Sequence, residues 1–466
     1  MATLTAVSSN YGTINGIQKD GYSVFRGIPF AKVPTGALRF APPQKPESFK
    51  EAYDAFTFRS IPMQHFTDPD GLYQKEFYDN PDFHFPISED CLYLNIWTPA
   101  HTASEKLPVA VWIHGGGFEH GFSTELEFDG EAYAKKGVIL ATISYRVNVF
   151  GFLYDQKQEE ELGFSGNQGL LDQIAALEWI SENIAAFGGN PDNITIMGQS
   201  AGAMSSHVLT FSPLATPMIH QAILQSGSIA CFPSPMVFTK AQAQAVTDKF
   251  YELCGVSSIE ELRRLPAEDL LDKSDELMAL YPSLPFRPVV DGHVLPDTPD
   301  VLTKEGGMAH IPYLMGVTKD DLFIPEGASH REGGFFTAAV SFANACRKQN
   351  LPVYLYEFCH DLPGSDDGAF HSSELWYTFG TLNRCWRPMT DEDHALAEEM
   401  VTCWTSFMKQ GDPNEDVKEE WKAWTEDGCF IKNLCLIVER FANLTRWRGS
   451  RQGLVQCKKM EPGIHF

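Results

Sequence analysis

The chain lacks several features that mark particular classes of protein. No apolar run approaches the roughly 18 consecutive residues that a membrane helix needs, so we expect no membrane-spanning segment. Residues Met1–Asn10 contain neither a basic stretch nor an apolar core and therefore do not resemble a signal peptide. Basic residues are few, because 36 Lys and Arg stand against 61 Asp and Glu, a net charge of −25. An acidic surface repels nucleic acids and anionic membranes, so neither is an expected partner.

The ten cysteines contain no CxxC pair, which argues against zinc sites and thioredoxin-like motifs. A chain of 466 residues can bury a large core and does not need disulfide staples. We therefore expect mostly free, buried thiols and a reducing, cytoplasmic location.

Apolar residues make up 43% of the chain and charged residues 21%, which is ordinary for a soluble protein. Strand-like and helix-like segments alternate through the first half of the chain, which predicts βαβ units and an α/β fold with a mostly parallel sheet. The expected strands are 92–97, 108–114, 138–144, 194–197, 222–225, 311–317 and 353–358, and the expected helices are 130–136, 170–186, 201–210 and 394–410. Residues 239–276 are helical and charged throughout, as in a lid inserted on the sheet. We expect one domain, 1–466, with helical insertions around 239–276 and 380–410.

Residues 61–88 are aromatic, acidic and aperiodic. This pattern predicts a long surface loop, and long loops in compact domains are often functional.

The most specific motif is the GxSxG sequence of residues 198–202, which follows an expected strand and opens an expected helix. A serine on such a sharp turn exposes its hydroxyl at the carboxyl edge of the sheet, where it can act as a nucleophile. The alternative is a tight turn with an inert serine. The strand–turn–helix context favours Ser200 as a nucleophile.

A glycine-rich sequence, His114-Gly115-Gly116-Gly117-Phe118, ends another expected strand. Three glycines let the backbone approach a substrate, and their N–H groups can face a developing oxyanion. A phosphate-binding loop is less consistent with the sequence, because no GK[ST] follows. A plain glycine-rich turn is the remaining alternative.

A serine nucleophile needs a histidine base and a carboxylate, which in α/β-hydrolases follow it in the order acid, then histidine. Asp320 and Asp321 come directly after the expected strand 311–317, where catalytic groups of open α/β sheets lie. His371 is the favoured base, with His293 and His360 as alternatives, since composition cannot choose among 14 histidines.

Together these motifs resemble the type-B carboxylesterase/lipase family of α/β-hydrolases, which includes mammalian carboxylesterases, bacterial p-nitrobenzyl esterase and cholinesterases. The resemblance extends from about Tyr11 to Asn443. Four further segments carry it: 25–31 (FRGIPFA), 88–95 (SEDCLYLN), 166–173 (GNQGLLDQ) and 187–191 (FGGNP).

The resemblance implies a serine esterase with no metal or organic cofactor and a small-molecule ester as substrate. It implies Ser200 as nucleophile, His371 as base and Asp321 as the acid, in place of the family's usual Glu. It also implies an oxyanion hole of Gly116, Gly117 and Ala201, and two structural ion pairs, Arg39–Glu89 and Arg146–Asp172. Asp320 and the more distant Glu326 are the alternative acids.

Several positions depart from the family pattern. No cysteine precedes Cys91, so the family's first disulfide cannot form, and Cys254 has only Arg263 and Arg264 where a partner would stand. Gln199 replaces a common Glu beside the nucleophile. No tryptophan lies between residues 61 and 90, where cholinesterases carry a choline-binding ring, so cholinesterase activity is not expected.

Two other functions are compatible with the same scaffold. One is amide or peptide-bond hydrolysis on the same triad, and the other is a non-catalytic adhesion-type member, against which the retained Ser200 and His371 argue. Four aromatic residues could line acyl and alcohol pockets or equally belong to the core: Phe118, Phe232, Phe286 and Phe379.

Overall fold

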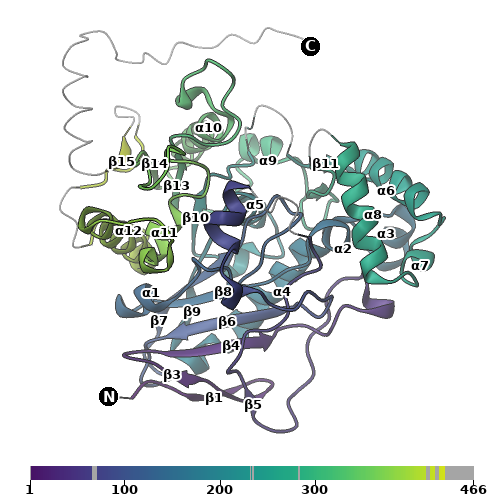
Figure 1. Cartoon of the computed structure of the whole chain (residues 1–466), viewed down its shortest axis with the longest axis horizontal. Coiled ribbons are helices and arrows are strands. Elements are labelled where there is room, and N and C mark those ends of the chain that lie inside the picture. The colour runs from purple at the N-terminus through teal and green to yellow at the C-terminus, as the bar shows by residue number, and fades with distance from the viewer. Residues whose placement is uncertain are drawn as a thin grey trace.

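The computed structural model describes residues 2–65, 71–230, 232, 236–281, 284–415, 420–425 and 430–435. A ten-stranded sheet runs through the centre of the molecule (Figure 1). Across the sheet the strands are β15 (Ile431–Leu434), β14 (Val353–Phe358), β13 (Tyr313–Thr318), β10 (Gln221–Gln225), β9 (Gly189–Gln199), β7 (Leu107–Ile113), β8 (Ile139–Ile143), β6 (Tyr93–Thr98), β4 (Ser23–Pro29) and β3 (Ile17–Gln18).

The sheet is parallel from β15 to β8 and antiparallel from β8 to β3. Two small sheets accompany it, one of β1 (Ala6–Ser9), β2 (Gly12–Asn15) and β5 (Tyr53–Asp54), the other of β11 (Phe238–Thr239) and β12 (Val289–Val290). The sequence prediction of a mostly parallel α/β sheet is confirmed.

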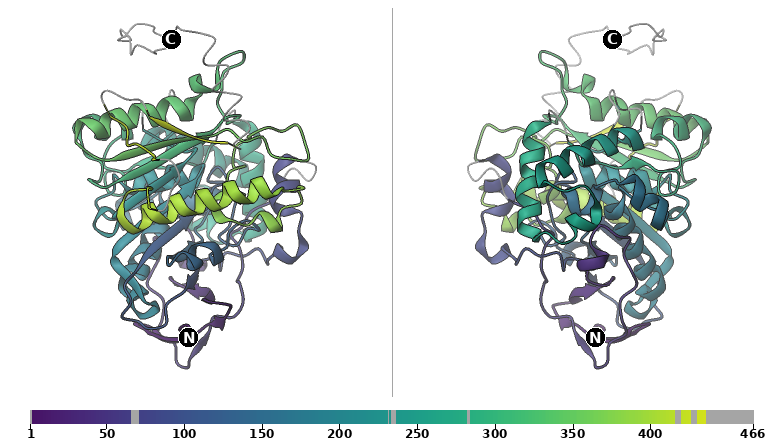
Figure 2. Two further views of the ribbon diagram at one scale, coloured as in Figure 1. Left: turned by 90° about the vertical axis from the view of Figure 1, so that its left-hand side faces the viewer. Right: turned by 90° about the vertical axis from the view of Figure 1, so that its right-hand side faces the viewer.

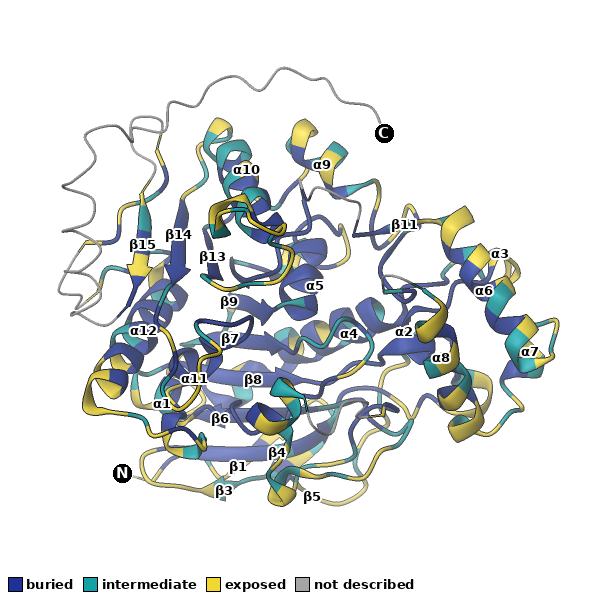
Figure 3. Cartoon of the chain, turned by 45° about the horizontal axis from the view of Figure 1, so that its top comes forward, coloured by how far each residue is buried: buried dark blue, intermediate teal, exposed yellow. Residues whose placement is uncertain are grey.

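The central strands are apolar on both faces because both faces are covered. In β7, Val109, Val111 and Ile113 belong to one hydrophobic cluster, whereas Ala110 and Trp112 belong to the other. Alternate residues of a strand point to opposite faces, so a buried parallel strand reads as a continuous apolar run. Figure 3 shows the central strands β7, β8 and β9 as buried, whereas the outer faces of helices such as α3, α6 and α7 are exposed.

Helices cover the two faces of the sheet (Figure 2). One hydrophobic cluster takes in buried residues of α4, α5 and α10, and the other takes in buried residues of α1, α11 and α12. Helices α3, α6, α7 and α8 gather at one end of the molecule (Figure 1). The helices are α1 (Glu131–Lys135), α2 (Asn148–Phe152), α3 (Gln156–Leu162), α4 (Gln168–Asn183), α5 (Ala201–Leu209), α6 (Lys240–Cys254), α7 (Ile259–Leu262), α8 (Ala267–Leu280), α9 (Pro299–Glu305), α10 (Gly334–Lys348), α11 (Leu375–Phe379) and α12 (Asp391–Gln410).

Differences from the expected elements lie mostly at their ends. Helix α12 begins three residues earlier than His394, because Thr390 and Asp393 form a capping box that satisfies the first N–H groups. Strands β1, β5, β11, β12 and β15 and helices α2, α3, α9 and α10 were not expected. None of the helices in the described part of the chain combines the length and the hydropathy that crossing a bilayer requires.

The prediction that residues 61–88 form a surface loop is wrong in part. A short helical turn, Gln74–Tyr78, buries Glu76 and Phe77. Glu76 forms a fully buried ion pair with Arg387 and accepts hydrogen bonds from Trp376 Nε1 (2.8 Å) and Trp386 Nε1 (3.0 Å). Breaking a buried ion pair costs several kcal/mol, typically about 3–5. These contacts anchor the segment to the main body of the protein.

The expectation of free thiols is wrong for one pair, because Cys359 and Cys435 form a disulfide. Phe358 pairs with Leu434 in the parallel register of β14 and β15, so the cysteines that follow lie side by side. Cys91 and Cys254 are free. The expectation for Cys231, Cys429 and Cys457 falls outside the described residues, as does the end of the family resemblance beyond residue 435.

Candidate active site

Ser200 lies on a strained turn between β9 and α5, with φ 55° and ψ −126°. The two glycines of the motif make this turn possible. A Cβ on Gly202 would lie 2.0 Å from the carbonyl oxygen of Ile113, and a Cβ on Gly198 would lie 2.4 Å from Gly202. Strain of this kind persists only where the surrounding structure holds it, as here where Ser200 N–H donates to the Gln225 carbonyl (2.9 Å).

The glycine-rich loop after β7 runs beside this turn. A Cβ on Gly116 would lie 2.1 Å from the carbonyl oxygen of His120, and φ is 100° at Gly116 and 64° at Gly117. Within the described part of the chain, no group accepts the N–H of Gly116, Gly117 or Ala201. All three residues line the same cavity as Ser200, and unpaired N–H groups in such a place can bind an oxyanion.

Asp321 and His371 come together from separate strand ends. Asp321 follows β13 and His371 follows β14, and Asp321 Oδ1 lies 2.6 Å from His371 Nδ1. Both side chains are only 5% exposed. The other carboxylate oxygen of Asp321 accepts from Ser226 Oγ (2.7 Å) and from the Thr318 N–H (3.2 Å). These bonds fix the carboxylate against the imidazole.

Gln199 fixes the tautomer of His371. The amide nitrogen of Gln199 lies 3.1 Å from His371 Nε2, and an amide nitrogen can only donate. Nε2 therefore accepts, and Nδ1 carries the proton that is donated to Asp321. This is the tautomer that a general base acting through Nε2 needs. The Ser200 hydroxyl makes no hydrogen bond to any described residue and lines the same cavity as His371.

The alternative candidates lie elsewhere. The Asp320 carboxylate is 45% exposed, and its Oδ2 accepts the Ala369 N–H (2.9 Å), so it braces the loop before His371. Glu326 is exposed. His360 is buried and paired with Asp393 (2.7 Å), and His293 packs on Phe164. None of these four candidates lines the cavity.

The cavity has a volume of about 280 Å³. Aromatic and aliphatic side chains line most of its wall: Tyr73, Phe77, Tyr78, Phe128, Met204, Met236, Leu284, Leu322, Phe323, Phe335 and Leu375. The four aromatic residues considered from the sequence, Phe118, Phe232, Phe286 and Phe379, are all buried and do not line it. They belong to the core.

Two carboxyl groups of the wall, Glu125 and Glu127, have no counterpart in the sequence-based site. Their position in the sequence, between the glycine loop and α1, was a signal that could have placed them in the wall of the site. Sequence alone did not show that this stretch folds back over Ser200, so they were missed, as were Tyr73, Phe77 and Tyr78.

Glu374 is a further buried carboxyl next to the site. Its Oε1 accepts from the Gln225 amide (3.2 Å), whereas its Oε2 has no partner among the described residues. Burial raises the pKa of Glu374 to about 7, the nearby Asp321 carboxylate adds to the rise, and His371 opposes it. Raised pKa values of buried acids cluster at functional sites.

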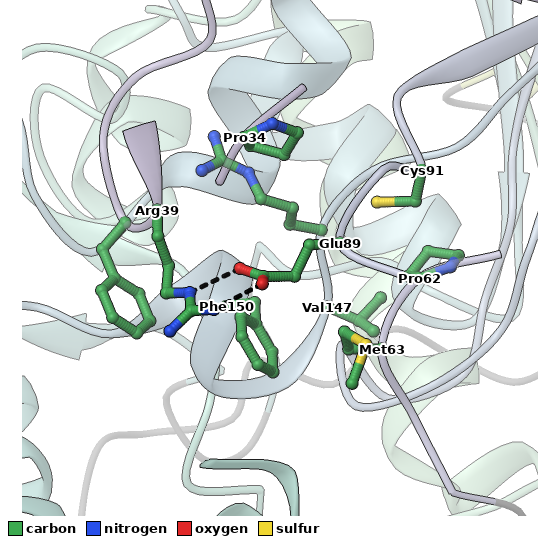
Figure 4. A pocket seen from close by; sticks show the side chains of 10 residues that line it. Pro34, Arg39, Pro62, Met63, Glu89, Cys91, Val147 and Phe150 are labelled. Atoms are coloured by element: carbon green, nitrogen blue, oxygen red, sulfur yellow. Dashed lines mark hydrogen bonds and ion pairs between the residues drawn. The ribbon is translucent and has the colours of Figure 1, made fainter. Parts of the chain in front are cut away.

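Both ion pairs implied by the sequence are present. Arg146 binds Asp172 through two bonds of 2.8 Å, and Arg39 binds Glu89 through bonds of 2.6 and 2.5 Å (Figure 4). The pocket beside Arg39 and Cys91 has a volume of only about 10 Å³, which is at the lower limit of what one water molecule needs. It is a structural site and not a second substrate pocket.

Comparisons with known proteins agree with this geometry. The model of the carboxylesterase family matches residues 3–332 and 327–433. Para-nitrobenzyl esterase of Bacillus subtilis (strain 168) is 34% identical over 90% of this chain and 93% of its own length. Carboxylesterase 1D of Rattus norvegicus is 38% identical over 88% of this chain and 85% of its own length.

Solved structures give the same result. A PNB esterase structure superposes with a TM-score of 0.82 at 32% identity, covering 93% of this chain and 96% of its own. A carboxylesterase of Geobacillus stearothermophilus superposes with a TM-score of 0.77 at 34% identity, covering 92% of this chain and 96% of its own. The predicted α/β-hydrolase fold is thereby confirmed. The chain belongs to the carboxylesterase family and is a carboxylic ester hydrolase.

Proposed function

We propose that the protein hydrolyses carboxylic esters through an acyl-enzyme formed on Ser200. One observation carries this proposal: Ser200, the residues of the glycine loop with unpaired N–H groups and His371 line one cavity, and Asp321 lies behind His371, 2.6 Å from its Nδ1. No other cluster in the described residues combines a nucleophile, a base and oxyanion donors.

The reaction begins when His371 Nε2 takes the proton of Ser200 as the hydroxyl attacks the ester carbonyl. Asp321 stabilises the imidazolium that forms, and keeps Nδ1 protonated throughout. The N–H groups of Gly116, Gly117 and Ala201 bind the oxyanion, and the loss of one such donor typically costs about 3 kcal/mol. His371 then protonates the leaving alkoxide, and a water activated by the same base hydrolyses the acyl-enzyme.

In this mechanism Gln199 must release Nε2 before Ser200 engages it. The catalytic hydrogen bonds of a free enzyme are often formed only when substrate arrives. Because the base must be neutral, activity should rise from acid toward neutral pH. Amide hydrolysis on the same triad is the second candidate, since the steps are identical and only the leaving group differs.

The proposal extends to the surroundings of the enzyme. Its substrate is a small ester held without a cofactor, and nucleic acids are not partners because of the charge of −25. We propose a cytoplasmic location. The free thiol of Cys91 supports this location and the Cys359–Cys435 disulfide opposes it. Cell fractionation tests the location. We also propose that residues 1–466 form one domain, with insertions at 239–276 and 380–410.

An ester panel of increasing acyl length tests the central claim, with wild type compared with Ser200→Ala. Wild type should hydrolyse at least some esters, and the variant should keep only the residual rate of about 10³–10⁴-fold over water that binding and the oxyanion hole supply. A matched pair of an aryl ester and its anilide separates esterase from amidase. Equal turnover of wild type and variant would exclude Ser200 as the nucleophile.

A further inference from the structure

Glu125 and Glu127 place two carboxyl groups in the wall of the catalytic cavity. They follow the glycine loop and precede α1, and their side chains are buried, with 5% and 1% exposure. The mechanism proposed above uses neither of them. Two acids at such a depth need an explanation, because burying an ionised carboxylate without a partner is costly.

The two side chains differ in their hydrogen bonds. Glu125 accepts the Phe122 N–H (2.9 Å) and the hydroxyl of Tyr78. Neither oxygen of Glu127 receives a hydrogen bond from another described residue, and neither glutamate forms an ion pair with one. The charge of Glu125 opposes ionisation of Glu127, so the two carboxyl groups do not both carry a charge unless a cation joins them.

The pKa values of this carboxyl pair, Glu125 and Glu127, are both raised, as expected for buried acids without a cation beside them. Burial raises the pKa of Glu125 to about 7. Burial, and then the neighbouring Glu125, raise the pKa of Glu127 well above its usual value, and Glu76 adds to the rise. Arg387 forms an ion pair with Glu76 and not with Glu125 or Glu127. This cation therefore does not balance the charge of the carboxyl pair.

Aromatic rings complete this part of the cavity. Tyr73, Phe77, Tyr78 and Phe128 line it together with the two glutamates. Aromatic faces attract cations, and this attraction grows when the site is dry. A buried carboxyl pair that has no cationic partner among the described residues and shares the cavity wall with aromatic rings therefore has the chemistry of an amine-binding site.

We propose that the carboxyl pair binds a primary or secondary ammonium group of the substrate, so that amine-bearing esters are the preferred substrate class. The argument for an N–H-bearing cation is geometric. The oxygens of Glu127 receive no hydrogen bond from another described residue and can accept from a primary ammonium, whereas a quaternary ammonium has no N–H to donate. This inference rests on the proposed ester hydrolysis at Ser200.

The test uses esters that differ only in one group, of which the aminomethyl and ethyl groups are isosteric. One series consists of para-aminomethylphenyl, para-ethylphenyl and para-trimethylammoniomethylphenyl acetate, which place the group on the alcohol. A second series of nitrophenyl benzoates places the same three groups on the acyl part. The readout is the ratio of kcat/KM between the aminomethyl and the ethyl ester within each series.

We expect wild type to prefer the aminomethyl ester by about tenfold or more in one of the series, in line with a hydrogen bond to a charged group. The trimethylammonium ester should gain less. In Glu127→Gln the ratio should fall close to one. Glu131→Gln, which makes the same substitution at an exposed glutamate paired with Lys135, should keep the wild-type ratio.

A ratio near one in both series of wild type, or a ratio unchanged by Glu127→Gln, would overturn the proposal. Should Glu127→Gln fail to fold, wild type still gives an answer: benzylamine should inhibit hydrolysis of the ethyl ester about tenfold more strongly than benzyl alcohol, and equal inhibition overturns the proposal. Hydrolysis of the neutral ester reports separately on the proposed function. Its absence would refute that function, whatever the ratio.

Discussion

Replacing Asp321 with asparagine should disable the enzyme without unfolding it. All four partners of the carboxylate donate hydrogen bonds to it: His371 Nδ1 and the Leu322 N–H to Oδ1, and Ser226 Oγ and the Thr318 N–H to Oδ2. An asparagine keeps only one acceptor oxygen.

The new amide group has two orientations, and each has a cost. With its NH₂ toward His371 it forces the imidazole into the wrong tautomer, because Nδ1 must then accept and Nε2 carries the proton. With its NH₂ toward Thr318 it faces a backbone donor. The first orientation, with the wrong tautomer of His371, typically lowers kcat about 10⁴-fold, equivalent to about 5 kcal/mol of activation free energy.

The assay compares kcat for a small aryl ester in Asp321→Asn and Asp320→Asn. Asp320→Asn is a matched control, because an asparagine oxygen can still accept the Ala369 N–H and the exposed ion pair with Lys319 is worth little, about 1 kcal/mol or less. We expect the control to stay within a few-fold of wild type, with both variants folded by circular dichroism. A near-normal Asp321→Asn together with an inactive Asp320→Asn would refute the reasoning.

Three other changes test separate parts of the structure. Glu374→Gln should alter the pH dependence of stability. The pKa of this buried acid is raised to about 7, so wild type loses up to about 3 kcal/mol of stability as pH rises through roughly 4.5 to 7. The variant should lack this loss when the free energy of unfolding is measured by denaturant titration at several pH values. A pH-independent stability difference would contradict it. Cys359→Ser should lower the free energy of unfolding by about 2–4 kcal/mol, and so should reduction of the Cys359–Cys435 disulfide in wild type. If neither change lowers the free energy of unfolding, the disulfide is absent in solution. Gln199→Glu should shift the acid side of the pH profile of kcat/KM to higher pH by about one to three units, because the new carboxylate would lie beside His371 Nε2 and favour imidazolium. An unchanged pH profile would mean that Gln199 does not contact the base.

The sequence predicted the fold class and the principal motifs because these depend on local patterns. The apolar run of β7 and the glycines around Ser200 are dictated by burial on both faces and by close backbone approach, both of which are visible in the chain itself. The order of acid and histidine further narrowed the choice of partners. Physical reasoning alone left Asp320 and Asp321 both open.

What sequence did not predict depends on contacts between distant segments. Cys359 meets Cys435 only because β15 pairs with β14 across 76 residues of sequence. Glu76 is buried only because Arg387 reaches it, so an aperiodic acidic stretch was taken for a surface loop. Glu127 faces the cavity because its segment folds back over the nucleophile, and its nearness in sequence to the glycine loop was the one local signal of that.

The most direct test of the account is to locate a covalent adduct. An organophosphate that reacts with activated serines should inactivate the enzyme in proportion to labelling, and peptide mass spectrometry should place one adduct per chain on Ser200. The Ser200→Ala variant should remain unlabelled and inactive. An adduct on another residue that accompanies loss of activity, or an active Ser200→Ala variant, would contradict the assignment of Ser200 as the nucleophile.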